Sequence, residues 1–482
     1  KPMENRALSR YKFIGHALRG DGPFSPVVSE FGAGSAQLQS DSYLIRYPRE
    51  SDQKYARRNE VAFYSSPLAR AVSRFVGYLG ARPPTRDVPN PLYQAVVDDV
   101  DGRGNAIDVF LSHFAYQAKA RGAMLLLVDM PSTPASSMAE QLETRRVPFW
   151  SMLTPEALVD FQVGDDGKFD FVEFSGNFRR DDGSRVECVW RFDRDGWEAS
   201  DPKKRILDAG PHYLGECPVL IFAEGESFPH FGQFAPIADL SRRLFNLDSE
   251  LDEILRAQTF SLLTMQVPDG SSDSQKLDAA KVAGETIGTN NLMVHSGSTP
   301  AFIAPPDGPA RVYLDRIDKL RAQIDEIGLD VTGSMQRESG IALQMRFQAL
   351  NGALARFAAQ MEDLERRAWD LSQRWLGMTQ APCVSWPRDF NLADVEAELK
   401  ILHDMQANGM PAEAVAAQQK RVVAVQFAGL DLDDQQEIIQ AIDERLLRPQ
   451  LPEGNVVPLQ RPDPNAPLRD AVVRALGGAD GR

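Results

Sequence analysis

Apolar residues in the C-terminal half of the chain recur in steps of three and four, which places them on one face of a helix. The first run comprises Ile237, Leu240, Leu244, Leu247, Leu251 and Ile254. The second comprises Tyr313, Ile317, Leu320, Ile324, Ile327 and Val331. The third comprises Leu343, Phe347, Leu350, Leu354, Phe357, Met361, Leu364, Ala368, Leu371 and Trp375. These runs predict three long helices, each of which is either an amphipathic helix packed in a core or a coiled-coil strand.

A polar segment separates the second and third runs and predicts a loop between two helices. Its residues are Gly333, Ser334, Gln336, Arg337, Glu338, Ser339 and Gly340. Glycine near each end gives the backbone freedom to turn, and Ser339 is the expected N-cap of the third helix. Gly352 lies inside that helix, where glycine costs about 1 kcal/mol relative to alanine, so we expect a kink or a close backbone approach there.

The N-terminal half mixes helical and strand patterns. Residues 1–50 are rich in Gly and Ser with few periodic positions, which predicts an extended arm. Helical patterns follow at 49–84 and about 90–120, and the apolar run 122–131 predicts a buried strand. From 147 to 222 the period changes to two with Asp-Gly turns, which predicts an antiparallel meander.

Two further regions have their own patterns. Between the first two long helices, 260–267 and 292–295 predict strands around a short helix at 279–285, a compact α/β insertion. After a short strand at 384–386, three helices are expected at about 393–407, 411–427 and 433–447. From residue 448 onward the chain is Pro-rich, with a composition typical of disorder.

The composition narrows the functional classes. The chain has 482 residues, of which 43% are hydrophobic, enough for several domains. Its net charge of −15 argues against conventional tight binding of nucleic acid, although an acidic protein can surround DNA without gripping it. No apolar run reaches the roughly 18–20 residues of a membrane span, and the first residues lack the apolar core of a signal peptide. A cytoplasmic product without membrane contact is therefore expected.

No catalytic constellation is evident. The chain contains no P-loop or nucleophile-elbow motif, and its six histidines have no metal-ligand spacing. The three cysteines, Cys188, Cys217 and Cys383, are far apart, which predicts reduced and mostly buried thiols. Four carboxylates crowd the first long helix at 248–253, where a charged helix face is commoner than a metal site. We therefore expect a protein that is not an enzyme and has no metal or cofactor.

The order of these elements resembles the portal proteins, or head-to-tail connectors, of tailed double-stranded DNA bacteriophages. The resemblance covers nearly the whole chain. The segments that carry it are Gly122–Pro131, Pro236–Gln258, Ser339–Phe347, Trp386–Phe390, and Asn408–Val415 ahead of the acidic Asp433–Ile439.

The resemblance implies an α+β ring subunit with a kinked long helix. Its segments would be an N-terminal arm and wing (1–235), a first stem helix (236–260), a clip (261–306), a second stem helix (307–331), a tunnel loop (332–340), the long helix with the remainder of the wing (341–400), crown helices (401–447) and a C-terminal tail (448–482). Stem positions would include Leu240, Leu244, Leu247, Leu251, Ile317, Leu320 and Ile324. The three apolar runs described above, here called seams, would pack against neighbouring subunits.

The resemblance also implies a function and partners. Twelve copies would form a ring at one capsid vertex of the virion, assembled in the host cytoplasm, through which double-stranded DNA enters and leaves. The large terminase subunit and later the head-tail adaptors would dock on the clip, and the major capsid protein would surround the ring. The tunnel loop would face the DNA, with Arg337 and Glu338 near it.

Two other classes compete with this hypothesis. A scaffold that oligomerises through coiled coils would explain the seams and the missing catalytic motifs, but it explains the α/β insertion less well. A nuclease or other nucleic-acid enzyme would need a carboxylate cluster, for which only the carboxylates at 248–253 are available.

Overall fold

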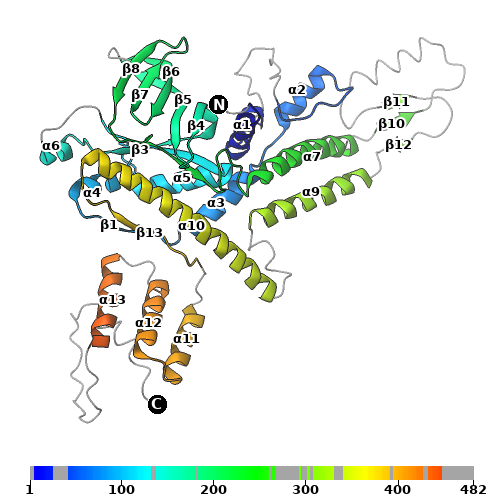
Figure 1. The fold of residues 1–482 in the computed structure, drawn as a ribbon. Coiled ribbons are helices and arrows are strands. Elements are labelled where there is room, and N and C mark those ends of the chain that lie inside the picture. The colour runs from blue at the N-terminus through cyan, green and yellow to red at the C-terminus, as the bar shows by residue number, and fades with distance from the viewer. Residues whose placement is uncertain are drawn as a thin grey trace, which may run out of the picture. The chain divides into compact units, whose positions relative to one another are not determined.

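The computed structural model describes residues 5–24, 42–131, 137–179, 183–259, 262–265, 292–294, 301–303, 308–329, 340–390, 395–426 and 432–447. The chain divides into two compact units, Lys1–Phe390 and Asn391–Arg482 (Figure 1). Helices and strands are both abundant in the first unit, which confirms the α+β class.

The centre of the first unit is a three-stranded antiparallel sheet covered by long helices. Strand β2 (Ala123–Asp129) lies between β3 (Phe149–Leu153) and β9 (Val219–Ala223). Helices α5 (Ile107–Arg121) and α10 (Gly340–Leu376) pack on the face that carries Met124 and Leu126. Leu125 on the other face belongs to a second core that includes Tyr11 and Phe169, so β2 is buried on both faces, as its uninterrupted apolar run predicts. Trp150 of β3 is fully buried, and its Nε1 donates to Ser372 Oγ at 3.1 Å.

The predicted meander is a separate five-stranded sheet. It comprises β4 (Leu158–Val163), β5 (Phe169–Arg179), β6 (Arg185–Asp193), β7 (Gly196–Ser200) and β8 (Ile206–Pro211), paired in chain order. In the β6–β7 turn, Asp193 Oδ1 accepts from the N–H groups of Asp195 and Gly196, both at 3.0 Å. The runs at the two ends of 147–222 were expected in this meander, but they are β3 and β9 and pair with β2 instead.

The expectation that residues 1–50 form an extended arm is wrong at its start. Residues Asn5–Arg19 form helix α1, which buries Tyr11, Ile14 and Leu18 at steps of three and four. Position 15 is a glycine although it lies inside this helix, because an added Cβ would stand 2.7 Å from Glu156 Oε1. A short 3-10 turn, Gly22–Phe24, follows, and another, Pro155–Ala157, precedes β4.

The other helical regions in the N-terminal half of the first unit follow the predicted pattern with one change. Helices α2 (Asp52–Val61) and α3 (Pro67–Leu79) occupy the expected 49–84 region. The single pattern at about 90–120 is two helices, α4 (Pro91–Asp98) and α5, with Asn90 capping α4 by accepting from Leu92 N–H at 2.9 Å. Helix α6 (Met138–Glu143) was not predicted.

Two small strand groups complete the first unit. β1 (Thr85–Asp87) pairs antiparallel with β13 (Cys383–Ser385). In the predicted insertion, β10 (Leu262–Met265) pairs in parallel with β11 (Leu292–Val294) and antiparallel with β12 (Ala301–Ile303). The helix expected at 279–285 lies outside the described residues.

The second unit contains the three expected helices, α11 (Val395–Ala407), α12 (Ala412–Gln426) and α13 (Leu432–Leu447). Their shared core comprises Ala416, Val423, Ile438 and Ile442. Gly409 has φ +63° and turns the chain after α11, as the Asn-Gly-Met-Pro stop signal predicts. Helix α11 begins within the segment 341–400 that was expected to belong to the wing. The tail from 448 lies outside the described residues.

Candidate functional site: the α7–α9 helix pair and its supports

Helices α7 (Ala235–Thr259) and α9 (Gly308–Ile327) form an antiparallel pair (Figure 1). Near one end, Tyr313 OH donates to Glu250 Oε2 at 2.8 Å. Near the other end, Leu244 and Ile324 line one cavity. The chain therefore leaves α7 and returns into α9 at the same end of the pair, with β10–β12 between them in sequence.

The apolar run of each paired helix faces the interior of its own unit. On α7, Leu244 and Leu251 are buried, and Leu240 and Leu247 are half-buried against the main core. On α9, Ile317, Leu320 and Ile324 are buried. The predicted stem residues are therefore core residues of the pair, and their role in a stem remains a prediction.

The long-helix seam, the apolar run of α10, is also buried within its own chain. Its residues Leu350, Leu354, Phe357, Met361 and Leu364 are buried in the main core of the same chain. Phe347 is half-buried against that core, and the side chain of Leu343 lies outside the described ones. The expectation that the seams pack against neighbouring subunits is therefore wrong for the described residues, because these faces are already covered within the subunit.

Helix α10 is continuous through Gly352. Among the described residues, a Cβ added at Gly352 would meet nothing within 4 Å, so the expected close backbone approach is not found there. None of the described groups explains the glycine, which lies on the exposed side of the helix.

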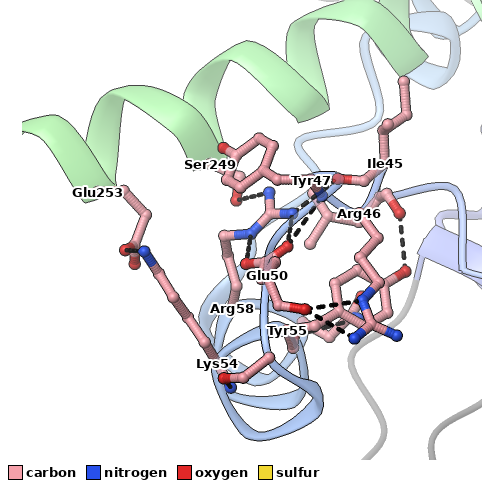
Figure 2. A network of polar contacts seen from close by, with 12 residues as sticks. Ile45, Arg46, Tyr47, Glu50, Lys54, Tyr55, Arg58, Ser249 and Glu253 are labelled. Carbon is pink, nitrogen blue, oxygen red and sulfur yellow. Dashed lines mark hydrogen bonds and ion pairs between the residues drawn. The ribbon is translucent and has the colours of Figure 1, made fainter.

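A buried guanidinium fastens the segment before α2 to helix α7 (Figure 2). Arg58 and Glu50 side chains are each 1% exposed, with Nε–Oε1 and Nη2–Oε2 distances of 2.9 Å. Arg58 also donates to the Ile45 carbonyl at 2.7 Å and to Ser249 Oγ of α7 at 3.4 Å. Its guanidinium carbon lies 4.1 Å from the centre of the Tyr47 ring.

This ion pair changes the acidity of Glu50. Burial opposes ionisation, but the hydrogen bonds from Arg58 and the Tyr47 N–H, together with the Arg58 charge, lower the pKa of the Glu50 carboxyl overall. The pair is therefore charged at neutral pH, and a bidentate buried pair fixes the orientation of both partners.

Asn246 of α7 holds the same segment by backbone contacts. Its Oδ1 accepts from Ile45 N–H at 2.7 Å, and its Nδ2 donates to the Tyr43 carbonyl at 3.0 Å. Lys54 of α2 reaches Glu253 of α7 at 3.4 Å (Figure 2). Helix α7 is thus fixed between Asn246 and Glu253 by polar contacts from a segment about 200 residues earlier, the separation between Ile45 and Asn246 being 201.

A second buried network holds helix α10 to the β1–β13 ribbon. Glu365 is fully buried and accepts from Arg86 Nε at 2.5 Å, Trp386 Nε1 at 2.7 Å and Trp369 Nε1 at 3.3 Å. Arg86 also reaches the exposed Asp108 at 2.7 Å. Helix α10 therefore has a fixed position at the end remote from Gly340.

The predicted loop is the part of the site that the structure does not describe. Gly333, Ser334, Gln336, Arg337, Glu338 and Ser339 lie outside the described residues. Gly340 is the first residue of α10, one position before the predicted start of the long-helix segment. The loop's contact with DNA and the N-cap role of Ser339 both stay predictions.

The carboxylates of α7 are spread over separate partners. Glu250 meets Tyr313, Glu253 meets Lys54 and Arg256, and burial raises the pKa of Asp248. Within the described ranges, no group of three or more His, Cys, Asp or Glu side chains is placed to hold a metal ion. Cys188 and Cys217 are buried, Cys383 is exposed, and burial raises the pKa of Cys217 to about 12.

Sequence reasoning missed both buried networks. Glu50, Arg58, Asn246, Arg86 and Glu365 are polar residues at buried positions, and nothing in their local sequence marks their partners. Asn246 and Ser249 give a faint signal, because with Ser241 they interrupt an otherwise apolar buried face of α7. None of the helices in the described part of the chain has both the length and the apolar character needed to cross a membrane.

No family model and no curated protein sequence matches the chain. Among solved structures, it is similar to a chain in the virion of a native gene transfer agent (GTA) particle, with 13% identity and a TM-score of 0.38. Chains in the neck of an empty GTA particle computed with C6 symmetry (12%, TM-score 0.38) and of a native GTA particle computed with C12 symmetry (13%, TM-score 0.39) are also similar. Each similarity covers 71% of this chain and 85% of the other. TM-scores below 0.5 at this level of identity do not establish a shared function.

Proposed function

We propose that this chain is the subunit of a phage portal ring through which double-stranded DNA passes. The observation that carries the proposal is the arrangement of the three long helices. An antiparallel pair, α7 and α9, brackets a small sheet, and the 37-residue helix α10 follows after the polar segment 330–339. All three helices turn their apolar faces into their own subunit.

The outer surface of α9 supports a ring rather than an isolated chain. Val312 and Leu314 are 66% and 49% exposed. Both residues are next to Tyr313 in the sequence, and Tyr313 faces α7. Because successive residues are about 100° apart around a helix, Val312 and Leu314 lie on opposite sides of Tyr313. A subunit in a ring meets a neighbour on both sides through two different surfaces, so apolar residues on both flanks of one helix suit such an assembly.

The competing scaffold hypothesis loses its main support. A coiled-coil scaffold needs free apolar seams, whereas the described seam residues are covered by their own chain. The nuclease hypothesis has less support, because two of the four α7 carboxylates, Glu250 and Glu253, have separate partners.

In the proposed ring, twelve subunits sit at one vertex of the capsid, within the major capsid protein. The insertion between α7 and α9 takes the large terminase subunit and later the head-tail adaptor. The polar loop at 332–340 lies at the channel and contacts the moving DNA without holding it. The protein is not an enzyme in this proposal, and packaging energy comes from the docked terminase.

The first test is the native mass of the purified protein together with negative-stain images. A ring with an axial hole and a mass near 12 × 53.4 kDa, about 641 kDa, is expected. The paired substitution Val312→Asp with Leu314→Asp is expected to reduce ring formation at least tenfold. Leu142→Asp, on the exposed side of α6, is the matched control. A monomer at all concentrations, or a ring unaffected by the paired substitution, would contradict the proposal or its interface.

The second test addresses the channel. Removal of residues 334–338 is expected to leave the ring intact and to impair DNA packaging or retention in assembled particles. Normal DNA packaging and DNA retention in particles with such rings would contradict the role assigned to the loop.

A further inference from the structure

A polar cleft of about 380 Å³ lies where α3 meets α7 and the C-terminal half of α9. Its rim carries Arg70 and Arg74 from α3 and Arg321 and Asp325 from α9. The apolar floor includes Leu244 of α7. None of these charged residues takes part in the two buried networks described above.

A close approach of α3 to Gly328, the residue that follows α9, bounds this cleft. A Cβ added at Gly328 would stand 3.2 Å from Ala71 Cβ and 3.0 Å from the Ile324 carbonyl oxygen. Arg70 and Arg74 are one turn apart on α3, and Arg321 and Asp325 are one turn apart on α9. The two rows of long side chains therefore face one another across a floor that is held in place by the core.

The cleft has an excess of positive charge in an acidic protein. Three guanidinium groups share it with one carboxylate, in a chain whose net charge is −15. Arg321 lies 3.9 Å from Asp318, and both side chains are more than half exposed, so this pair neutralises little of its charge. Guanidinium groups bind phosphate oxygens with paired hydrogen bonds, and three of them around one cavity suit that ligand.

The first turn of α3 adds to the anion preference. Ser65 and Pro67 also line the cleft. The N-cap Ser66 makes no side-chain capping bond, because its hydroxyl donates to the carbonyls of Ala17 and Leu18. The positive end of the α3 dipole therefore lies beside the arginines without a side-chain cap.

We propose that this cleft binds phosphate groups of the double-stranded DNA backbone, an inference that rests on the proposed function. Asp325 and Gly328 immediately precede the polar segment 330–339, which the proposed function assigns to the channel. The cleft then lies at the base of each loop, and a ring repeats it once per subunit. Brief contacts of this kind centre the duplex without reading its sequence.

The experiment compares two triple variants with equal change of charge. The cleft variant carries Arg70→Gln, Arg74→Gln and Arg321→Gln. The control carries Arg57→Gln, Arg103→Gln and Arg316→Gln, three exposed arginines outside the cleft. Rings of each, verified by native mass, are titrated with a fluorescent DNA duplex at a series of NaCl concentrations.

The cleft variant is expected to bind the duplex at least tenfold more weakly than the control at low salt. Its slope of log K against log[NaCl] should be shallower by about 0.9 for each phosphate that the variant no longer neutralises. Equal affinities and equal slopes for the two variants would overturn the inference while leaving the ring, and the proposed function, standing.

Three further outcomes are distinguishable. Inorganic phosphate at constant ionic strength that raises the Tm of wild type but not of the cleft variant, with unchanged DNA binding, would show a free-anion site and overturn the DNA assignment. Loss of the ring in the cleft variant alone would show that the cleft receives a carboxylate of a neighbouring copy, which also overturns it. Absence of a ring in wild type would instead overturn the proposed function.

Discussion

Two buried arginine–glutamate pairs stabilise this molecule in different ways. The Arg58–Glu50 pair joins residues eight positions apart and closes a local segment onto α7. The Arg86–Glu365 pair joins residues 279 positions apart, and Glu365 also receives two indole N–H groups. The first pair orders a segment, whereas the second unites parts of the chain that are remote in sequence.

From this difference we expect that chain separation and the number of partners set the cost of losing a buried charge. Removing one member of a buried ion pair leaves an uncompensated charge, which costs more than the pair contributes. At Glu365 this removal would leave two buried indole N–H groups without their acceptor and would leave Arg86 with only the exposed Asp108 as a carboxylate partner. At Glu50 it would strand one guanidinium in a segment that can open locally, which limits the cost.

The largest effect is expected for Glu365→Ala, with a decrease of about 3–5 kcal/mol in the free energy of unfolding. Denaturant unfolding measures it. Asp108 is the second partner of Arg86, and the Asp108 side chain is 58% exposed. The substitution Asp108→Ala should therefore lower the free energy of unfolding by under about 1 kcal/mol. Equal decreases for the two variants would show that the buried carboxylate has no special weight.

Glu50→Ala is expected to cost about 3 kcal/mol, at the lower end of the range for broken buried pairs. Hydrogen exchange should increase in residues 42–61 and along α7, and remain unchanged in α10. Lys54→Ala is the control in the same region, because its ion pair with Glu253 is exposed. Increased exchange in α10 would contradict the local character of this network.

The contribution of Glu50 to stability depends on pH. Its folded-state pKa lies below the unfolded value because Arg58 stabilises the carboxylate. The contribution is therefore complete above the unfolded pKa of about 4.3 and is lost as pH falls through the lower folded pKa. The stability difference between wild type and Glu50→Gln should shrink over that acidic range, and a constant difference would refute the assignment.

The smallest effect is expected at the partly exposed contact between α7 and α9. Tyr313→Phe removes the hydroxyl that donates to Glu250 and should cost about 1 kcal/mol. Thermal unfolding of this variant and of Tyr213→Phe, whose ring is 89% exposed, provides the comparison. A larger destabilisation at Tyr213 would show that the Tyr313 hydroxyl contributes nothing.

Periodicity predicted the long helices, the C-terminal helices and most strands, because burial of one face imposes a regular spacing of apolar residues along the chain. It missed α1, whose Gly15 and charged positions obscure the buried face of Tyr11, Ile14 and Leu18. It assigned β3 and β9 to the wrong sheet, since strand pairing depends on partners far along the chain.

The candidate site was less predictable than the fold. The seam positions were identified correctly as apolar faces, but their partners are within the same chain. The buried networks and the arginine cleft depend on side chains brought together by tertiary packing, such as Arg86 and Glu365. The spacing of residues along the chain does not indicate which distant side chains pack together.

The antiparallel α7–α9 pair has a consequence for how this chain tolerates change. The chain departs from α7 at Thr259 and returns at Gly308 beside the same end of the pair. Closing a segment between two adjacent, fixed points costs entropy that grows only slowly with its length. The intervening segment can therefore be lengthened, shortened or replaced by another sequence while the two helices keep their places.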